Sequence, residues 1–275
     1  MYSKAYVEIT NVCNRACSFC HGTKRPARRM TLDEFKAVAK KLQGFTKYIY
    51  FHVLGEPLTH PDLVEMIKHA RECGFNPAVT TNGTLLKRRS DELLSSGVYK
   101  VNISLHSFEE GSDEEFSEYI GSCLDFADKA SDGGILTVLR LWNEGHDGGR
   151  NSLILDMMKK RFDFEWTFGS RGARLRDKLH LEYGERFEWP DADAENYGEV
   201  GRCYGLIDQF GILSDGTVVP CCLDADGIIS LGNAFTEELS DILSSERANK
   251  IREGFKKKCY TEPLCQKCGF SKKFK

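Results

Sequence analysis

The chain has 275 residues, of which 41% are hydrophobic and 29% are charged, and its formal net charge is −3. These proportions are ordinary for a globular protein, and the slightly acidic balance gives no general basic footprint for nucleic acid. No run approaches the ~20 apolar residues of a membrane-spanning helix, and the N-terminus carries no signal-peptide pattern. We therefore expect a cytoplasmic protein with neither nucleic-acid nor membrane partners.

Strands and helices alternate through the first part of the chain. Apolar runs rich in β-branched and aromatic residues predict strands, and capped amphipathic runs predict helices. The predicted strands cover 5–10, 47–54, 77–81, 100–105, 135–141 and 163–168, and the predicted helices cover 31–41, 61–73, 84–95, 113–130 and 151–161. Six β–α repeats with short connections indicate an α/β fold with a parallel sheet and right-handed crossovers.

The alternation ends after Phe168. Residues 169–200 are polar and rich in charge and glycine, with a possible hairpin around Leu179–Trp189, and we interpret them as a linker that could also wall an active site. The last part is predicted to contain short strands at 207–213 and 217–220, a helix at 236–253, and most of the remaining cysteines. These boundaries give a core domain over 1–168, a linker over 169–200, and a small cysteine-rich α+β module over 201–275.

Three cysteines, Cys13, Cys17 and Cys20, follow the first predicted strand in a Cys-x₃-Cys-x₂-Cys loop. Three thiolates are too few to close a tetrahedral zinc site or to ligate all four irons of a [4Fe–4S] cube. The count therefore favours a cube with one open iron, to which a small molecule could bind. A zinc site completed by His21 and three free thiols both remain possible from these residues alone.

Polar residues also follow the other predicted strands, at the edge where parallel sheets carry their chemistry. Gly55-Glu56-Pro57 follows the second strand, Asn82 follows the third, and Ser104 and Arg140 end the fourth and fifth. Glu56 could accept hydrogen bonds from an ammonium group, and Arg140 could hold a carboxylate. Their shared placement predicts one site that includes the cysteine loop.

Together these motifs resemble the radical S-adenosylmethionine (SAM) superfamily. The resemblance rests on the cysteine loop with Phe19 before its last cysteine, on Gly55-Glu56-Pro57 and on Thr81-Asn82-Gly83. It covers about residues 5–168 and implies a partial (β/α)₆ barrel. It also implies that Cys13, Cys17 and Cys20 hold a [4Fe–4S] cluster whose open iron binds SAM. The implied SAM-binding residues are Phe19, Gly55, Glu56, Pro57, Asn82, Ser104 and Arg140.

A second thiol set, Cys203, Cys221, Cys265 and Cys268, lies in the C-terminal module. Four thiolates suit a closed zinc site or a fully ligated iron–sulfur cluster. Beside the N-terminal motif, the pattern resembles the SPASM/twitch auxiliary-cluster modules of some radical SAM enzymes. Six cysteines in this part favour the shorter twitch form with a single auxiliary [4Fe–4S] cluster. Spacing does not decide whether Cys222 or Cys259 is a ligand.

The resemblance implies that SAM is reductively cleaved to a 5′-deoxyadenosyl radical, which abstracts a hydrogen from the substrate. An auxiliary cluster without an open iron would accept an electron, which predicts a two-electron oxidation. The layout is similar to that of radical SAM dehydrogenases of aminoglycoside biosynthesis, although substrate identity does not transfer with layout. We expect a small polar metabolite as substrate and a flavodoxin- or ferredoxin-type electron donor.

Acid–base candidates at the predicted mouth are Arg171, Glu144 and His106, because an alcohol oxidation needs a group that takes the hydroxyl proton. Two other functions remain open. A peptide-modifying radical SAM enzyme would use similar clusters, although the chain begins directly at its first strand, which favours the metabolite. A zinc-binding interaction module is the alternative from another class.

Overall fold

The first five strands lie side by side and run parallel, as predicted. They are β1 (Lys4–Val7), β2 (Tyr48–Tyr50), β3 (Asn76–Thr81), β4 (Lys100–Ser104) and β5 (Leu136–Glu144). The helices that follow them are α1 (Leu32–Leu42), α2 (Leu63–Glu72), α3 (Leu86–Ser95), α4 (Asp113–Asp132) and α5 (Arg150–Arg161). Thr31 and Glu34 form the capping box expected at the start of α1. The α/β prediction is therefore confirmed for the first five repeats.

The sixth parallel strand is not the one that the sequence predicted. Its place beside β5 is taken by β8 (Leu179–Glu185). The run predicted at 163–168 contributes only to β6 (Thr167–Gly169), which pairs antiparallel with β7 (Gly172–Arg176). All three residues of β6 are exposed, whereas Leu179 and Leu181 of β8 are buried. The segment 169–200, expected to be a linker, thus supplies two strands. The alternating burial of β8 favours its place beside β5 more than the aromatic side chains of 163–168 favour theirs.

The C-terminal part continues the same sheet on the other side of β1. Strand β9 (Gln209–Ile212) runs parallel to β1, and β10 (Thr217–Val219) and β11 (Gly232–Asn233) follow antiparallel. The helix predicted at 236–253 is two helices, α6 (Leu239–Ser244) and α7 (Glu246–Lys256), separated by Ser245, whose side chain caps α7. The short helices α8 (Pro263–Gln266) and η3 (Gly269–Phe274) end the described chain.

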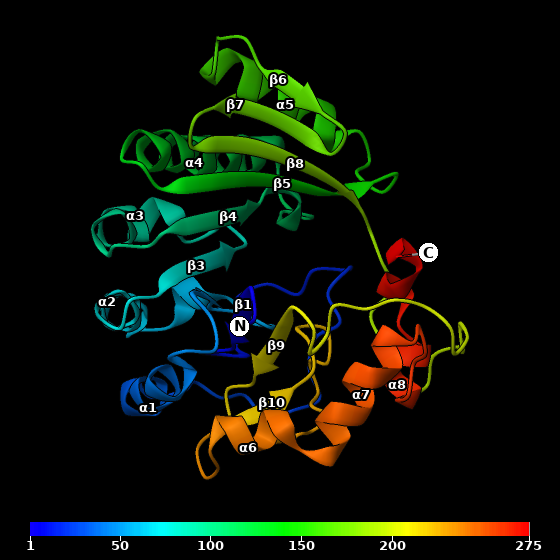
Figure 1. Cartoon of the computed structure of the whole chain (residues 1–275). Helices are drawn as coiled ribbons and strands as arrows, with labels where there is room; N and C mark the ends of the chain where they lie inside the picture. Colours follow the sequence, from blue (N-terminus) through cyan, green and yellow to red (C-terminus); the bar gives the residue numbers. More distant parts are fainter. Residues whose placement is uncertain (275) are drawn as a thin grey trace.

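The computed structural model describes residues 1–274, in which the strands form one open sheet in the order β11-β10-β9-β1-β2-β3-β4-β5-β8-β7-β6. Figure 1 shows the helices α1 to α4 along one side of this curved sheet and α7 and α8 on the other. Apolar side chains such as Ile49, Val101 and Leu139 belong to the main hydrophobic core. Among residues 1–274, no helix is long and apolar enough to cross a membrane.

Candidate active site

The cysteine loop is packed against the loop that follows β2. Gly55 has a φ of +74°, and a Cβ at this position would lie 2.2 Å from the carbonyl oxygen of Thr10. The next residue, Glu56, donates its backbone N–H to the carbonyl of Val12 at 3.0 Å. Only glycine combines this backbone conformation with so close an approach. Gly55 therefore sets the position of the chain just before Cys13.

Glu56 is buried at the ends of two strands. It caps the short helix η1 (Pro57–Thr59), in which Pro57 is also buried. The two carboxylate oxygens of Glu56 accept backbone N–H groups from Leu58 at 3.0 Å and from Asn82 at 2.6 Å. Burial raises the pKa of Glu56 to about 7, although these N–H groups act in the opposite direction. Glu56 thus ties the loops after β2 and β3 together, and a contact with the amino group of SAM stays a prediction.

Asn82 connects the end of β3 to the first cysteine. Its Nδ2 lies 3.8 Å from Cys13 Sγ and donates to Asn14 Oδ1 at 2.9 Å. Cys17 Sγ lies 3.6 Å from the carbonyl oxygen of Ser107, just after β4. Burial raises the pKa of Cys17 to about 11, and the charges of Glu109, Cys13 and Cys20 add to the shift. Three thiols that repel one another as thiolates fit a site completed by cationic iron.

The last turn of the cysteine loop is held from β4 and β8. The backbone N–H of Ser18 donates to Glu109 Oε2 at 2.6 Å, and Arg186 pairs with Glu109 at 3.3 Å. The guanidinium of Arg186 lies 5.4 Å from the ring centre of Phe19, and Trp189 Nε1 donates to the Phe19 carbonyl at 3.1 Å. Sequence reasoning missed Glu109, Arg186 and Trp189, and the latter two lie in a segment that was predicted only as a possible hairpin within a linker.

Arg140 and Ser104 are brought together, as expected. They are paired directly across β4 and β5. Arg140 Nε donates to Glu182 Oε2 at 3.1 Å, and its guanidinium lies 4.5 Å from the ring centre of Trp142. A guanidinium that is held in place through its Nε can bind a carboxylate with its terminal N–H groups. Glu182 was missed for the same reason as Arg186, since it lies on β8.

The three acid–base candidates do not gather in one place. Arg171 is exposed in the turn between β6 and β7, at the outer edge of the sheet. Glu144 is exposed at the end of β5, where it borders a shallow depression with His146 and Arg186. His106 alone is part of the site, with its ring 4.9 Å from that of Phe19. Burial lowers the pKa of His106 to about 4, so its imidazole is neutral near neutral pH.

A second group of thiols is assembled from separate segments of the C-terminal part. Burial, followed by the charges of Cys203, Cys222 and Cys265, raises the pKa of Cys221 well above its usual value. Burial, Cys203 and Cys268 have the same effect on the pKa of Cys265. These thiols are therefore neighbours, and their binding of one cluster together with the other predicted ligands stays a prediction. Within residues 1–274, no three His, Cys, Asp or Glu side chains are arranged to hold a single metal ion.

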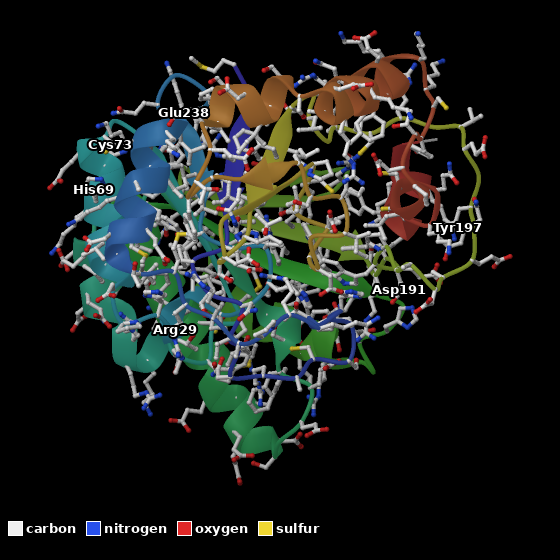
Figure 2. All side chains as sticks on the ribbon, turned by 90° about the horizontal axis from the view of Figure 1, so that it is seen from below. Arg29, His69, Cys73, Asp191, Tyr197 and Glu238 are labelled. Carbon is white, nitrogen blue, oxygen red and sulfur yellow. The ribbon has the colours of Figure 1, made fainter. Side chains whose placement is uncertain are left out.

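The remaining cysteines differ in their surroundings. Cys222 joins the second thiol group and packs against a cluster of buried residues that includes Tyr6 on β1. Cys259 is exposed and pairs with Val200 in an isolated bridge. Cys73 lies 3.5 Å from His69 on α2, and Figure 2 shows both at the edge of the molecule opposite Tyr197. Cys222 is thus the thiol that joins the C-terminal group to the strands of the core.

Asp226 connects the cysteine loop to the C-terminal part. It accepts hydrogen bonds from the Thr23 hydroxyl at 2.9 Å and from the Lys24 N–H at 3.0 Å, and it lies 3.2 Å from His21 Nε2. Nearby, Arg25 forms a buried ion pair with Glu8 at 2.5 Å. His21, considered above as a zinc ligand, is therefore engaged by Asp226.

An open parallel sheet with a three-thiol loop at its strand ends defines an α/β protein with an iron–sulfur site for a small ligand. The comparisons identify it further. Residues 7–139 match the Radical SAM superfamily, and residues 203–269 match the SPASM iron–sulfur cluster-binding domain. The chain belongs to the radical SAM superfamily and carries a SPASM domain. Its cofactors are accordingly SAM, a SAM-binding [4Fe–4S] cluster and auxiliary iron–sulfur clusters in the second domain.

Curated relatives match only part of the chain. A PqqA peptide cyclase from Bradyrhizobium diazoefficiens is 33% identical over 117 residues, which are 41% of this chain and 31% of that protein. A probable GTP 3′,8-cyclase from Saccharolobus islandicus is 32% identical over 118 residues, which are 42% of this chain and 37% of that protein. The matches thus span less than half of the length of these relatives, and their reactions differ.

Solved structures match nearly the whole chain. BtrN in complex with AdoMet and 2-DOIA superposes with a TM-score of 0.62 at 18% identity, covering 98% of this chain and 93% of BtrN. Streptococcus suis SuiB bound to precursor peptide SuiA gives 0.57 at 17% identity, covering 99% and 70%. The enzyme anSMEcpe with bound AdoMet and a peptide gives 0.58 at 17%, covering 97% and 88%. At these identities the likeness shows the fold alone.

Proposed function

We propose that this chain is a radical SAM oxidoreductase that oxidises a small polar metabolite by two electrons. The observation that supports it best is the packing of Cys222 against the buried cluster that includes Tyr6. Tyr6 lies on the same face of the sheet as Tyr50, with which it is paired. The second thiol group therefore adjoins the face of the sheet that is not covered by α1 to α4, and an electron acceptor there would be next to a substrate.

When bound, SAM on the reduced N-terminal cluster supplies a 5′-deoxyadenosyl radical that takes a substrate hydrogen, and an auxiliary cluster supplies an acceptor for the second electron. The residues around these groups would have distinct tasks. Cys13, Cys17 and Cys20 would hold the first cluster, and Cys203, Cys221, Cys265 and Cys268 would hold the second. Arg140 would bind a carboxylate, and Ser104 a hydroxyl.

The oxidation also releases one proton. Glu182 is a carboxylate on the same face as Arg140, and its side chain is 37% exposed. A carboxylate that is reachable and held in place can accept a proton within hydrogen-bond distance. We assign this role to Glu182 in preference to Arg171, which lies on the edge hairpin. Each SAM cleaved uses one electron at the first cluster, and the auxiliary cluster gains one electron from the substrate radical, so the two electrons balance over a turnover. The proposal includes a flavodoxin- or ferredoxin-type protein of the reducing cytoplasm, which would reduce the first cluster at the start and take up the electron from the second.

Metal analysis of anaerobically reconstituted protein tests the proposal. The native chain should hold about eight irons, from two four-iron cubes, and should form 5′-deoxyadenosine when reduced. Cys203→Ala should retain about four irons and still cleave SAM, but it should not complete substrate oxidation. The exposed Cys259→Ala is the matched control and should behave like the native protein. Zinc without iron, and no SAM cleavage, would refute the proposal and favour the zinc-binding module.

A peptide-modifying activity is the second candidate. It is favoured by the sequence match to a PqqA peptide cyclase and by the structural likeness to SuiB bound to its precursor peptide. A short open reading frame beside the gene would supply the peptide to test. Modification of that peptide, detected as a mass change after anaerobic incubation with SAM, would replace the metabolite proposal.

A further inference from the structure

The face of the sheet that is not covered by α1 to α4 carries polar and aromatic side chains. Residues paired across neighbouring strands lie on one face, and side chains two apart along a strand share that face. Tyr6 is paired with Tyr50, Tyr50 with Ala78, and Ala78 with Lys100. The same face therefore includes Lys4, Tyr50, His52, Lys100, Asn102 and Trp142. We call it the interior face.

Positive charge predominates on the interior face. Burial lowers the pKa of Lys100, and the positive charges of Arg140 and Lys4 lower it further. Glu182 opposes this effect, but its carboxylate is already bonded to Arg140. Within residues 1–274, neither Lys4 nor Lys100 forms an ion pair, and the Lys4 ammonium lies 5.9 Å from the ring centres of Tyr6 and Tyr50. Two half-buried ammonium groups thus share one face on which the Glu182 carboxylate is paired with Arg140 rather than with either lysine.

Three buried polar atoms on this face have no hydrogen-bond partner. They are His52 Nδ1, Asn102 Oδ1 and Trp142 Nε1. Asn102 is fully buried, and its Nδ2 donates to Thr80 Oγ1 at 3.0 Å, so only its oxygen is free. The indole N–H of Trp142 can only donate. Buried polar groups are rarely left without partners, so the Trp142 N–H indicates a place that is completed by a group that accepts hydrogen bonds. The Asn102 oxygen can only accept, and it would need a donor such as a hydroxyl on the same ligand.

We propose that the interior face binds an anionic group of the substrate, a carboxylate or a phosphate, at Lys4 and Lys100. The inference rests on the proposed function, because it gives the substrate of that oxidation an anionic end. The two ammonium groups supply the counter-charge, and the Trp142 N–H and Tyr50 hydroxyl are donors on the same face. A carboxylate or phosphate relieves the mutual repulsion of the lysines, which no neutral group would do.

The anionic end is distinct from the carboxylate of SAM. Arg140 lies opposite Ser104 at the end of β4, where SAM is expected to bind. Lys100 begins the same strand, four residues earlier, which corresponds to ~13 Å along the sheet. A substrate that reaches from the SAM site toward Lys100 must therefore be elongated, with its reacting carbon at one end and its anion at the other. On this proposal, the substrate is a carboxylic acid or a phosphoester.

Titration calorimetry on reconstituted protein with SAM bound tests the inference without knowledge of the substrate. The probes are inorganic phosphate and malonate, each added at constant ionic strength. The native protein should bind at least one of them at a single site. Lys100→Met should weaken this binding at least tenfold, and Lys4→Met should weaken it in the same direction. The exposed Lys160→Met on α5 is the matched control and should bind as the native protein does.

Each outcome is decisive. Preference for phosphate identifies a phosphoester and preference for malonate a carboxylic acid, and both support the inference. No binding of either probe to the native protein, or unchanged binding in both lysine variants, overturns it. Lys100→Arg, which keeps the charge, should retain binding and guards against a folding defect in Lys100→Met. Because no turnover is measured, a protein that binds the anion but does not cleave SAM would refute the proposed function alone.

Discussion

The two thiol regions of this molecule are built in opposite ways. Cys13, Cys17 and Cys20 lie within one short loop, and Cys13 and Cys20 are exposed. The C-terminal ligands come from segments between Cys203 and Cys268, and burial is the main cause of their raised pKa values. The first region is local in sequence and largely exposed, whereas the second depends on tertiary structure and is less exposed.

This difference matches the tasks of the two sites. An open site needs a thiol loop that leaves one side free. Here the loop is held by contacts with residues outside it, namely Asn82, Glu109 and Trp189. An enclosed site is rigid because its ligands are already part of a packed module. Side chains that support metal ligands often matter nearly as much as the ligands themselves. The open loop should therefore be more sensitive to changes in its neighbours than the enclosed group.

The largest effect is expected from Cys17→Ala. Loss of one of three thiols should empty the first cluster, lower the iron content from about eight to about four, and abolish 5′-deoxyadenosine formation. The second cluster should persist, because its ligands come from a different part of the fold. Iron and sulfide analysis with an electron paramagnetic resonance spectrum measures both. Cys73→Ala, outside both thiol groups, is the control, and loss of all iron in Cys17→Ala would mean that the regions are not independent.

A smaller effect is expected from Gly55→Ala, compared with Gly74→Ala. Both glycines have positive φ, +74° and +85°, so each substitution strains the backbone by about 1–3 kcal/mol. Only at Gly55 would the new methyl group collide with the Thr10 carbonyl, whereas nothing lies within 4 Å of it at Gly74. Gly55→Ala should weaken SAM binding at least tenfold, and Gly74→Ala should leave it unchanged. Equal SAM affinities of the two variants, measured by titration, would contradict a role of Gly55 in shaping the SAM site.

Much of the open site could be predicted because its residues follow strands with clear patterns. Gly55, Asn82, Ser104 and Arg140 fall at ends of strands that the sequence indicates, and parallel strands present their ends at one edge. Glu182 and Arg186 could not be found, because 163–168 contains Phe164, Trp166 and Phe168 and so resembles a strand more than 179–185 does. In the sequence, the aromatic residues of 163–168 are a stronger strand signal than the alternation of Leu179 and Leu181.

The contacts between the two regions were beyond sequence reasoning. Asp226 and His21 are 205 residues apart, and Cys222 and Tyr6 are similarly distant in the chain. Nothing in local pattern indicates that β9 is added beside β1, which is what brings these pairs together. The predicted boundary at 201 treated the C-terminal part as a separate module. Its first strand instead continues the sheet of the core.

The smallest effect is expected from Asp226→Asn, which tests the connection between the two regions. Burial raises the pKa of Asp226, but the Lys24 N–H, the Thr23 hydroxyl and His21 lower it more. A carboxylate with a depressed pKa stabilises the fold above its unfolded-state pKa of about 3.9, and this is lost as pH falls through the folded value. The variant should lose about 1–2 kcal/mol, seen as a melting temperature about 2–8 °C lower. This deficit should shrink below about pH 4, where the native carboxylate becomes protonated. Exposed Asp193→Asn is the control, and a deficit independent of pH would show that packing rather than charge joins the loop to the second thiol region.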